Sequence, residues 1–224
     1  MNLFKALSYK EWIKTRKVIG ILFFVIVAVL VYSFIEVNHS IRLDNANNIW
    51  YSFLFMYGDL PRVAYQIPLL AGLSLALVQF VPEMVNKRLK LTLHLPADET
   101  SIISSMLCFG YLVLSGLFLL MVIVYAIGLT LIFPSEITCS LLSKLLPSIV
   151  AGLAVYGLTA WICFEPQWKQ RIFNLVIAIG LLSILFTSED TGVYLHFGIG
   201  LLLILVVSFV LPFFSVNRFK HGVQ

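Results

Sequence analysis

The residues best suited to chemistry lie in residues 83–105, the longest polar interruption on one side of an otherwise apolar chain. This segment begins with Glu83 and continues with the basic residues Lys87, Arg88 and Lys90. Four leucines then stand at alternate positions, namely Leu89, Leu91, Leu93 and Leu95, and Pro96 follows them. Charges next to leucines suit the docking of another protein, so we interpret the segment as the place where a soluble partner acts on the chain.

Patterns that would indicate catalysis do not accompany this segment. The Leu-Ser-Gly tripeptide at 114–116 lacks the first glycine of a Gly-x-Ser-Gly pattern, and the chain contains neither HExxH nor a glycine-rich phosphate loop. Cys108, Cys139 and Cys163 are too far apart for a common metal or disulfide framework. We therefore expect a non-enzyme without a metal or cofactor of its own; a membrane enzyme would need a site that the sequence does not display.

The composition indicates that the solvent of this chain is lipid. Of its 224 residues, 60% are hydrophobic and only 12% are charged, and the mean hydropathy is +0.99. A soluble domain carries roughly twice that charged fraction. The net charge of +4 does not point to nucleic acid, because the basic residues cluster beside apolar segments, as they do in membrane proteins.

The apolar runs predict a single all-α membrane domain over residues 1–224, with six transmembrane helices. A run of about 20 apolar residues is long enough to cross the hydrocarbon layer as a helix. The fifth run is short, and the sequence leaves open whether it crosses fully. The predicted spans are 18–35, 63–81, 102–133, 145–164, 172–187 and 193–214. Residues 1–17 mix basic, aromatic and apolar side chains, which favours an interfacial helix over a solvated basic tail.

The basic residues predict which side of the membrane each loop occupies. Twelve lie on one side, and the positive-inside rule makes that side cytoplasmic, with both termini there. Those twelve are Lys5, Lys10, Lys14, Arg16, Lys17, Lys87, Arg88, Lys90, Lys169, Arg171, Arg218 and Lys220. The other side holds Arg42, Arg62 and Lys144.

Few polar residues lie within the predicted spans, and none of them is an Asp, Glu, Lys or Arg away from a span end. That disfavours an ion-coupled carrier. Gln66 and Gln79 are candidates for a translocation path, although polar residues in spans more often join helices. The pairs Gly72 with Ala76 and Ser148 with Gly152 have the small-xxx-small spacing that lets helices approach closely.

The conformation of residues 86–96 has two interpretations. Leucines at every second position are typical of a half-buried strand. A lone strand at a membrane surface would leave backbone groups unpaired, however. Leu89 and Leu93 are also four residues apart, which fits a short helix, and Asn86 is a suitable cap for it. We favour the helix.

The order of these features resembles the membrane subunit of ABC-2 type transporters, and of the related haem-exporter membrane subunit of cytochrome c maturation. That family commonly has a Lys-Glu pair and a later basic residue near its N-terminus, which match Lys10, Glu11 and Arg16. It also has an acidic residue at the end of the second span, then basic residues, leucines and a Leu-Pro. The matching residues here are Glu83, Lys87, Arg88, Leu93, Leu95 and Pro96. The resemblance covers the whole chain in architecture and some 25 residues in motif.

This resemblance implies a permease subunit of an ATP-driven exporter in the bacterial inner membrane. A separate ATP-binding subunit would hold ATP and Mg, and a second copy or paralogue would complete the dimer in the bilayer, with no nucleic acid involved. Coupling to the ATP-binding subunit falls to Glu83, Lys87, Arg88, Leu91 and Leu93, with Trp12 and Arg16 beside them. The alternative is a scaffold that does not transport and recruits a cytoplasmic partner through the same basic surface.

Overall fold

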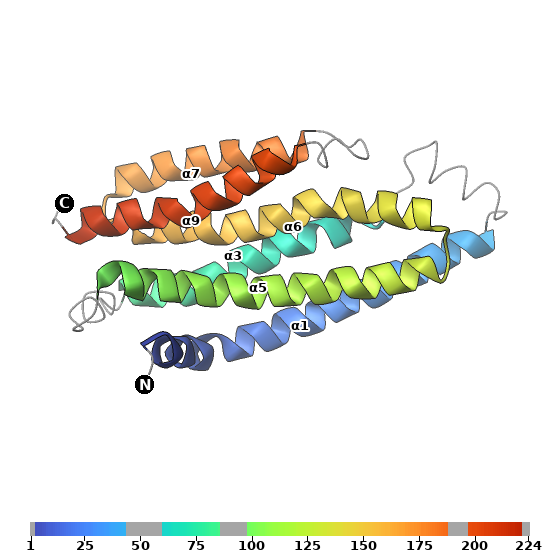
Figure 1. Ribbon diagram of the computed structural model, residues 1–224, viewed down its shortest axis with the longest axis horizontal. Coiled ribbons are helices and arrows are strands. Elements are labelled where there is room, and N and C mark those ends of the chain that lie inside the picture. Colours follow the sequence, from blue (N-terminus) through green and yellow to red (C-terminus); the bar gives the residue numbers. More distant parts are fainter. Residues whose placement is uncertain (1–2, 44–59, 86–97, 188–196, 221–224) are drawn as a thin grey trace.

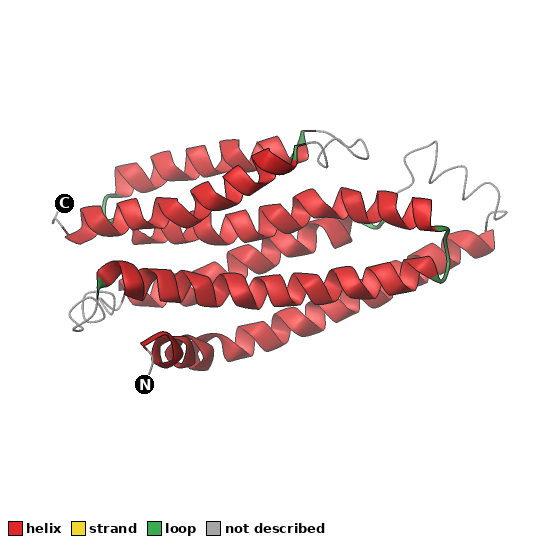
Figure 2. Cartoon of the chain, viewed as in Figure 1, coloured by secondary structure: helices red, strands yellow, loops and turns green. Residues whose placement is uncertain are grey.

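A computed structural model describes residues 3–43, 60–85, 98–187 and 197–220, and these residues form helices without any β-strand. Figure 2 shows the all-helical chain. The helices are α1 (Leu3–Leu43), α3 (Arg62–Val85), α5 (Glu99–Thr130), α6 (Ser135–Phe164), α7 (Trp168–Ser183) and α9 (Gly198–Lys220), and the short 3-10 helix η1 (Ile184–Phe186) extends α7. The prediction of an all-α polytopic membrane protein is confirmed.

Six helical stretches in this part of the chain are long and apolar enough to cross a membrane. The shortest, Trp168–Phe186, has 19 residues, which is long enough to cross although the sequence left that open. The helix ends do not mark the membrane boundaries, because α1 alone has 41 residues and measures roughly 60 Å at 1.5 Å per residue. The span boundaries given above therefore stay predictions.

Helix α6 lies at the centre of the bundle. It contacts α3, α5, α7 and α9, and its most extensive contact is with α3 (Figure 1). Inside the chain, 78% of its most apolar stretch is buried, whereas only 17% of the corresponding stretch of α7 is. The outward-facing side chains of the other helices are largely apolar, as expected of helices in contact with lipid.

The helices run along the long axis of the molecule, so each end of the bundle collects the ends of several helices. One end, at the left of Figure 1, holds the starts of α1, α5 and α7 and the ends of α3, α6 and α9. We name it the basic end, because Lys5, Lys10, Lys14, Lys169 and Arg218 lie on these helix termini. The opposite end holds Arg42, Arg62 and Lys144.

Helix α1 changes direction near its start. Figure 1 shows its first turns end-on, so they cross the long axis of the bundle, while the rest of α1 runs along that axis. The helix remains continuous from Leu3 to Leu43, and the predicted separation at residues 17 and 18 is not a break in it. The Thr15 hydroxyl donates to the carbonyl of Glu11 at 2.8 Å, a back-bond that often bends helices.

The packing of α3 against α6 depends on small residues. A side chain at Gly72 would meet the carbonyl of Gly152, and one at Gly152 would meet the carbonyl of Pro68. The backbones of the two helices are therefore in direct contact, which confirms the close approach that these small residues predict. Pro68 and Pro82 both lie inside α3, which continues through them.

Candidate functional site

A cluster of buried charges joins the start of α1 to the end of α3 at the basic end. The Glu83 carboxylate, in the last turn of α3, has no exposed surface. Its Oε1 lies 2.8 Å from Lys14 Nζ, which donates a hydrogen bond to it, and 3.2 Å from Lys10 Nζ. Lys14 Nζ also lies 3.0 Å from Oε2 of Glu11, which is equally buried. One ammonium group is thus shared by two buried carboxylates.

The position of Glu83 explains why it needs these lysines. A carboxylate in the last turn of a helix faces the negative end of the helix dipole, which disfavours it. Burial adds a desolvation cost, and only a close partner of opposite charge can offset that cost. Lys14 and Lys10 supply two positive charges to the two negative charges of Glu11 and Glu83, so the cluster is neutral as a whole. We name Lys10, Glu11, Lys14 and Glu83 the charge cluster.

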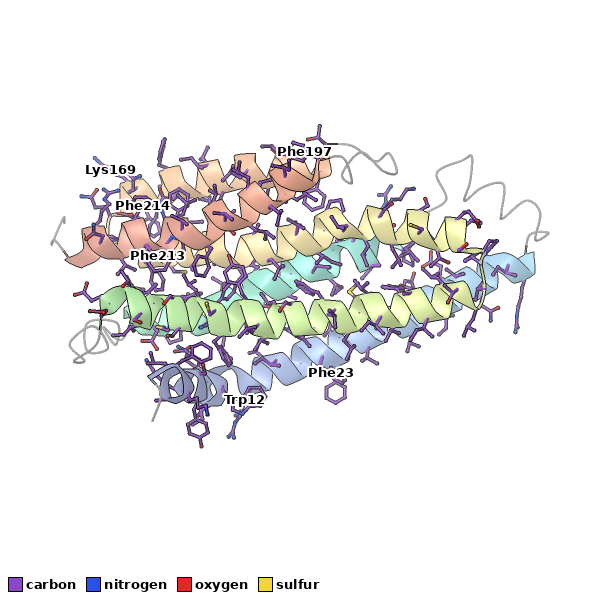
Figure 3. All side chains as sticks on the ribbon, viewed as in Figure 1. Trp12, Phe23, Lys169, Phe197, Phe213 and Phe214 are labelled. Atoms are coloured by element: carbon purple, nitrogen blue, oxygen red, sulfur yellow. The ribbon has the colours of Figure 1, made fainter. Side chains whose placement is uncertain are left out.

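The charge cluster occupies the inner side of α1, and the predicted docking residues of α1 occupy the outer side. Trp12 and Arg16 are both exposed and stand four residues apart, so they share one face of the helix. Figure 3 shows Trp12 projecting from the outer side of α1. The start of α1 therefore has an inner face fixed to α3 and an outer face that is accessible.

A third buried carboxylate occupies the corresponding position at the end of α6. Glu165 follows the last residue of α6, is 1% exposed, and accepts a hydrogen bond from Ser215 of α9 at 2.7 Å. Its Oε1 lies 3.6 Å from Arg218 Nη1, and its backbone carbonyl accepts from Arg171 Nε at 2.6 Å. Glu83 and Glu165 thus fasten the ends of the two central helices, α3 and α6, to the outer helices α1 and α9.

One turn inside the charge cluster, Gln79 joins three helices. Its Nε2 donates to the carbonyl of Met106 on α5 at 2.9 Å, and its Oε1 accepts from the hydroxyl of Tyr156 on α6 at 2.8 Å. The side chains of Gln79 and Tyr156 are both fully buried. Gln79 and Glu83 are four residues apart on one face of α3, so the polar contacts continue from the basic end into the bundle.

The structure does not bring the two predicted path residues together. Gln66 is exposed on α3, whereas both ends of the Gln79 amide are hydrogen-bonded inside the chain. The two residues are 13 positions apart, which is about 20 Å along the helix and places them on different faces. In this structure Gln79 connects helices, and a role in translocation stays a prediction for both.

Four of the predicted coupling residues, Lys87, Arg88, Leu91 and Leu93, lie in residues 86–97, outside the described residues. The choice between helix and strand there stays open for the same reason. The structure does describe the other three: Glu83 is buried, whereas Trp12 and Arg16 are exposed.

Sequence reasoning gave no structural role to Lys14 or Glu165. Lys14 carried a usable signal, because Glu11 and Lys14 are three residues apart on one helix face. Glu165 and Ser215 are 50 residues apart, and no local sequence pattern predicts such a pair.

Comparisons of the chain with protein-family models, curated proteins and solved structures found no match. Within the described ranges, no three His, Cys, Asp or Glu side chains gather in a way that could hold a metal ion. At the basic end, the described charges join helix ends: Glu83 joins α3 to α1, and Glu165 joins α6 to α9.

Proposed function

We propose that this chain is the membrane-spanning permease subunit of an ATP-driven exporter, moved by a separate ATP-binding subunit. The observation that carries the proposal is the charge cluster. It fastens the start of α1 to the last turn of α3, and Glu83, the α3 member of the cluster, is also the first residue of the predicted docking segment 83–105. A partner that grips this segment would pull α3 and α1 together.

The contact between α3 and α6 would carry the displacement further. The backbones of these helices touch at Gly72 and Gly152, so we expect a displacement of one to move the other. The buried Gln79 joins them again through Tyr156. ATP and Mg would be bound by the partner, and the differential affinity of ATP for two states of the complex would supply the work. The resemblance to ABC-2 membrane subunits implies a second copy or paralogue and a bacterial inner membrane with both termini cytoplasmic.

The experiment is co-purification of the tagged chain from its native membrane, followed by identification of the proteins retained. We expect an ATP-binding subunit, and we expect its yield to fall at least tenfold for the double variant Leu91→Asp/Leu93→Asp. The matched control is Asn38→Asp/Ser40→Asp, which adds the same charge to two exposed positions at the opposite end of α1 and should leave the yield unchanged.

Two results would overturn the proposal. Wild-type chain that retains no ATP-binding protein would favour the scaffold that recruits another partner. Equal capture by wild type and by the Leu91→Asp/Leu93→Asp variant would mean that docking does not use the leucines of residues 86–97.

A further inference from the structure

A cavity opens between the start of α5 and the end of α9 at the basic end of the bundle. Its volume is about 380 Å³, within the usual range for pockets that bind small molecules. These two helices otherwise make few contacts with each other. None of the residues of the charge cluster lines the cavity, so it is a separate feature of the molecule.

The lining of the cavity changes from polar to apolar along the bundle. Glu99, Thr100 and Asn217 lie toward the basic end. The apolar lining residues include Ile103, one turn further into α5, and Phe213 and Val210, one and two turns before Asn217 on α9. Seven residues of helix separate Val210 from Asn217, so the polar and apolar ends are about 10 Å apart. A ligand that fits must itself be amphipathic.

The cavity borders the outward-facing surface of α9, which we expect to face lipid. Val210 and Phe214 line it and are 41% and 61% exposed, respectively. Figure 3 labels Phe213 and Phe214 on α9 near the basic end. An acyl chain can therefore enter from the bilayer, with its headgroup left at the polar end, without first passing through water.

The polar end holds an acceptor and donors that a headgroup with both charges can use. The Glu99 carboxylate can accept a hydrogen bond from an ammonium group, since a carboxylate has room for several donors. Asp98 stands at the N-cap of α5, but its side chain makes no capping hydrogen bond. The backbone N–H groups of that first helical turn, with Thr100 and Asn217, can donate to a phosphate. The acceptor Glu99 and the donors Thr100 and Asn217 therefore line the same end of the cavity.

We propose that this cavity binds one phospholipid whose headgroup carries a primary ammonium group and a phosphate, as phosphatidylethanolamine does. Its acyl chain lies against Ile103, Val210 and Phe213, and its ammonium group donates to Glu99. Phosphatidylcholine has no N–H to donate, and phosphatidylglycerol has no positive charge. The inference does not depend on an ATP-binding partner and concerns the membrane part alone.

The test is native mass spectrometry of the purified full chain, released from bilayers of equal parts phosphatidylethanolamine, phosphatidylcholine and phosphatidylglycerol. We expect one retained lipid, with phosphatidylethanolamine in about tenfold excess over the others, the factor that one charge-assisted hydrogen bond provides. Glu99→Gln should reduce that excess to about twofold or less, because a neutral amide is a weaker acceptor for an ammonium group. Glu136→Gln, an exposed carboxylate at the opposite end, should keep it.

A second variant tests the apolar end. Val210→Trp places a large ring at the side opening and should abolish retention of the lipid. Val206→Trp adds the same ring one turn away, at a position that is 60% exposed and does not line the cavity, and should retain it.

Three outcomes would overturn the proposal. The first is a wild-type chain that retains no lipid, and the second is retention of the three lipids in their bilayer proportions. The third is a Val210→Trp variant that still retains the lipid, or one that changes the oligomeric state instead. A changed oligomeric state would assign this face to a second copy of the chain.

Discussion

At the residue scale, the charge cluster is the most demanding feature of the molecule. Two carboxylates without exposed surface, Glu11 and Glu83, depend on one shared ammonium group, whose side chain is 15% exposed. A surface ion pair contributes little to stability, because water competes for both partners. A buried carboxylate that loses its cation keeps its desolvation cost without compensation. The cluster therefore makes Lys14, which contacts both carboxylates, more important to stability than an exposed lysine such as Lys17.

We predict that Lys14→Met lowers the free energy of unfolding by about 3 kcal/mol, the usual cost of breaking a buried ion pair. The control is Lys17→Met, at an exposed position of the same helix, which should change stability by less than about 0.5 kcal/mol. Thermal unfolding of the purified protein in detergent, followed by circular dichroism, gives the comparison.

The double variant Lys14→Met/Glu83→Gln makes this prediction specific. Lys14→Met leaves Glu11 and Glu83 with Lys10 as the one remaining cation of the charge cluster, and removal of the Glu83 charge makes the cluster neutral again, so the double variant should be more stable than Lys14→Met alone. Losses that simply add would show that Lys14 and Glu83 do not act as a pair.

At the scale of elements, the contact of α3 with α6 positions everything else. The backbones meet at Gly72 and Gly152, and the polar contacts of Gln79 and Glu83 follow on later turns of α3. Between apolar helices in lipid there is no hydrophobic driving force, so close packing and a few hydrogen bonds must hold the pair together. A change that separates these backbones would loosen the bundle at its centre.

We predict that Gly72→Ala destabilises the chain, because the added methyl group would meet the Gly152 backbone, which cannot rotate away as a side chain can. Overpacking of this kind costs about 1–3 kcal/mol. Gly116→Ala is the matched control, since open space surrounds Gly116 on α5 and alanine is the better helix former. Thermal unfolding should place Gly72→Ala several degrees below wild type and Gly116→Ala at or above it. The reverse order would contradict the packing described here.

The helices themselves could be predicted from the sequence, whereas the contacts between them could not. Apolar runs and charge placement predicted the helical class and the six candidate spans, because lipid leaves the backbone few other choices. The small-residue pairs also indicated close approach. The sequence could not predict that Glu165 pairs with Ser215. Nor could it predict that Gln79 pairs with Tyr156, which lies 77 residues further along the chain. Those contacts depend on how the helices rotate and pack, which no local pattern records.

At the scale of the whole molecule, the orientation of the bundle is a prediction from the basic residues, and the cysteines can test it. Cys139 is exposed in the second turn of α6 at the opposite end, whereas Cys108 and Cys163 are partly buried within helices. The positive-inside rule places the opposite end outside the cell. We therefore predict that a membrane-impermeant maleimide labels wild-type chain in intact cells and does not label Cys139→Ser.

Two cysteines added to the Cys139→Ser chain complete this test. Ser135→Cys, at the exposed start of α6, should be labelled in intact cells, because it shares the opposite end with residue 139. Lys169→Cys, exposed at the basic end on α7 (Figure 3), should be labelled only after the membrane is opened. Exchanged accessibilities would invert the bundle and put residues 83–105 outside the cell, out of reach of a cytoplasmic ATP-binding subunit. The orientation of the whole molecule thus decides whether the charge cluster can have the coupling role proposed for it.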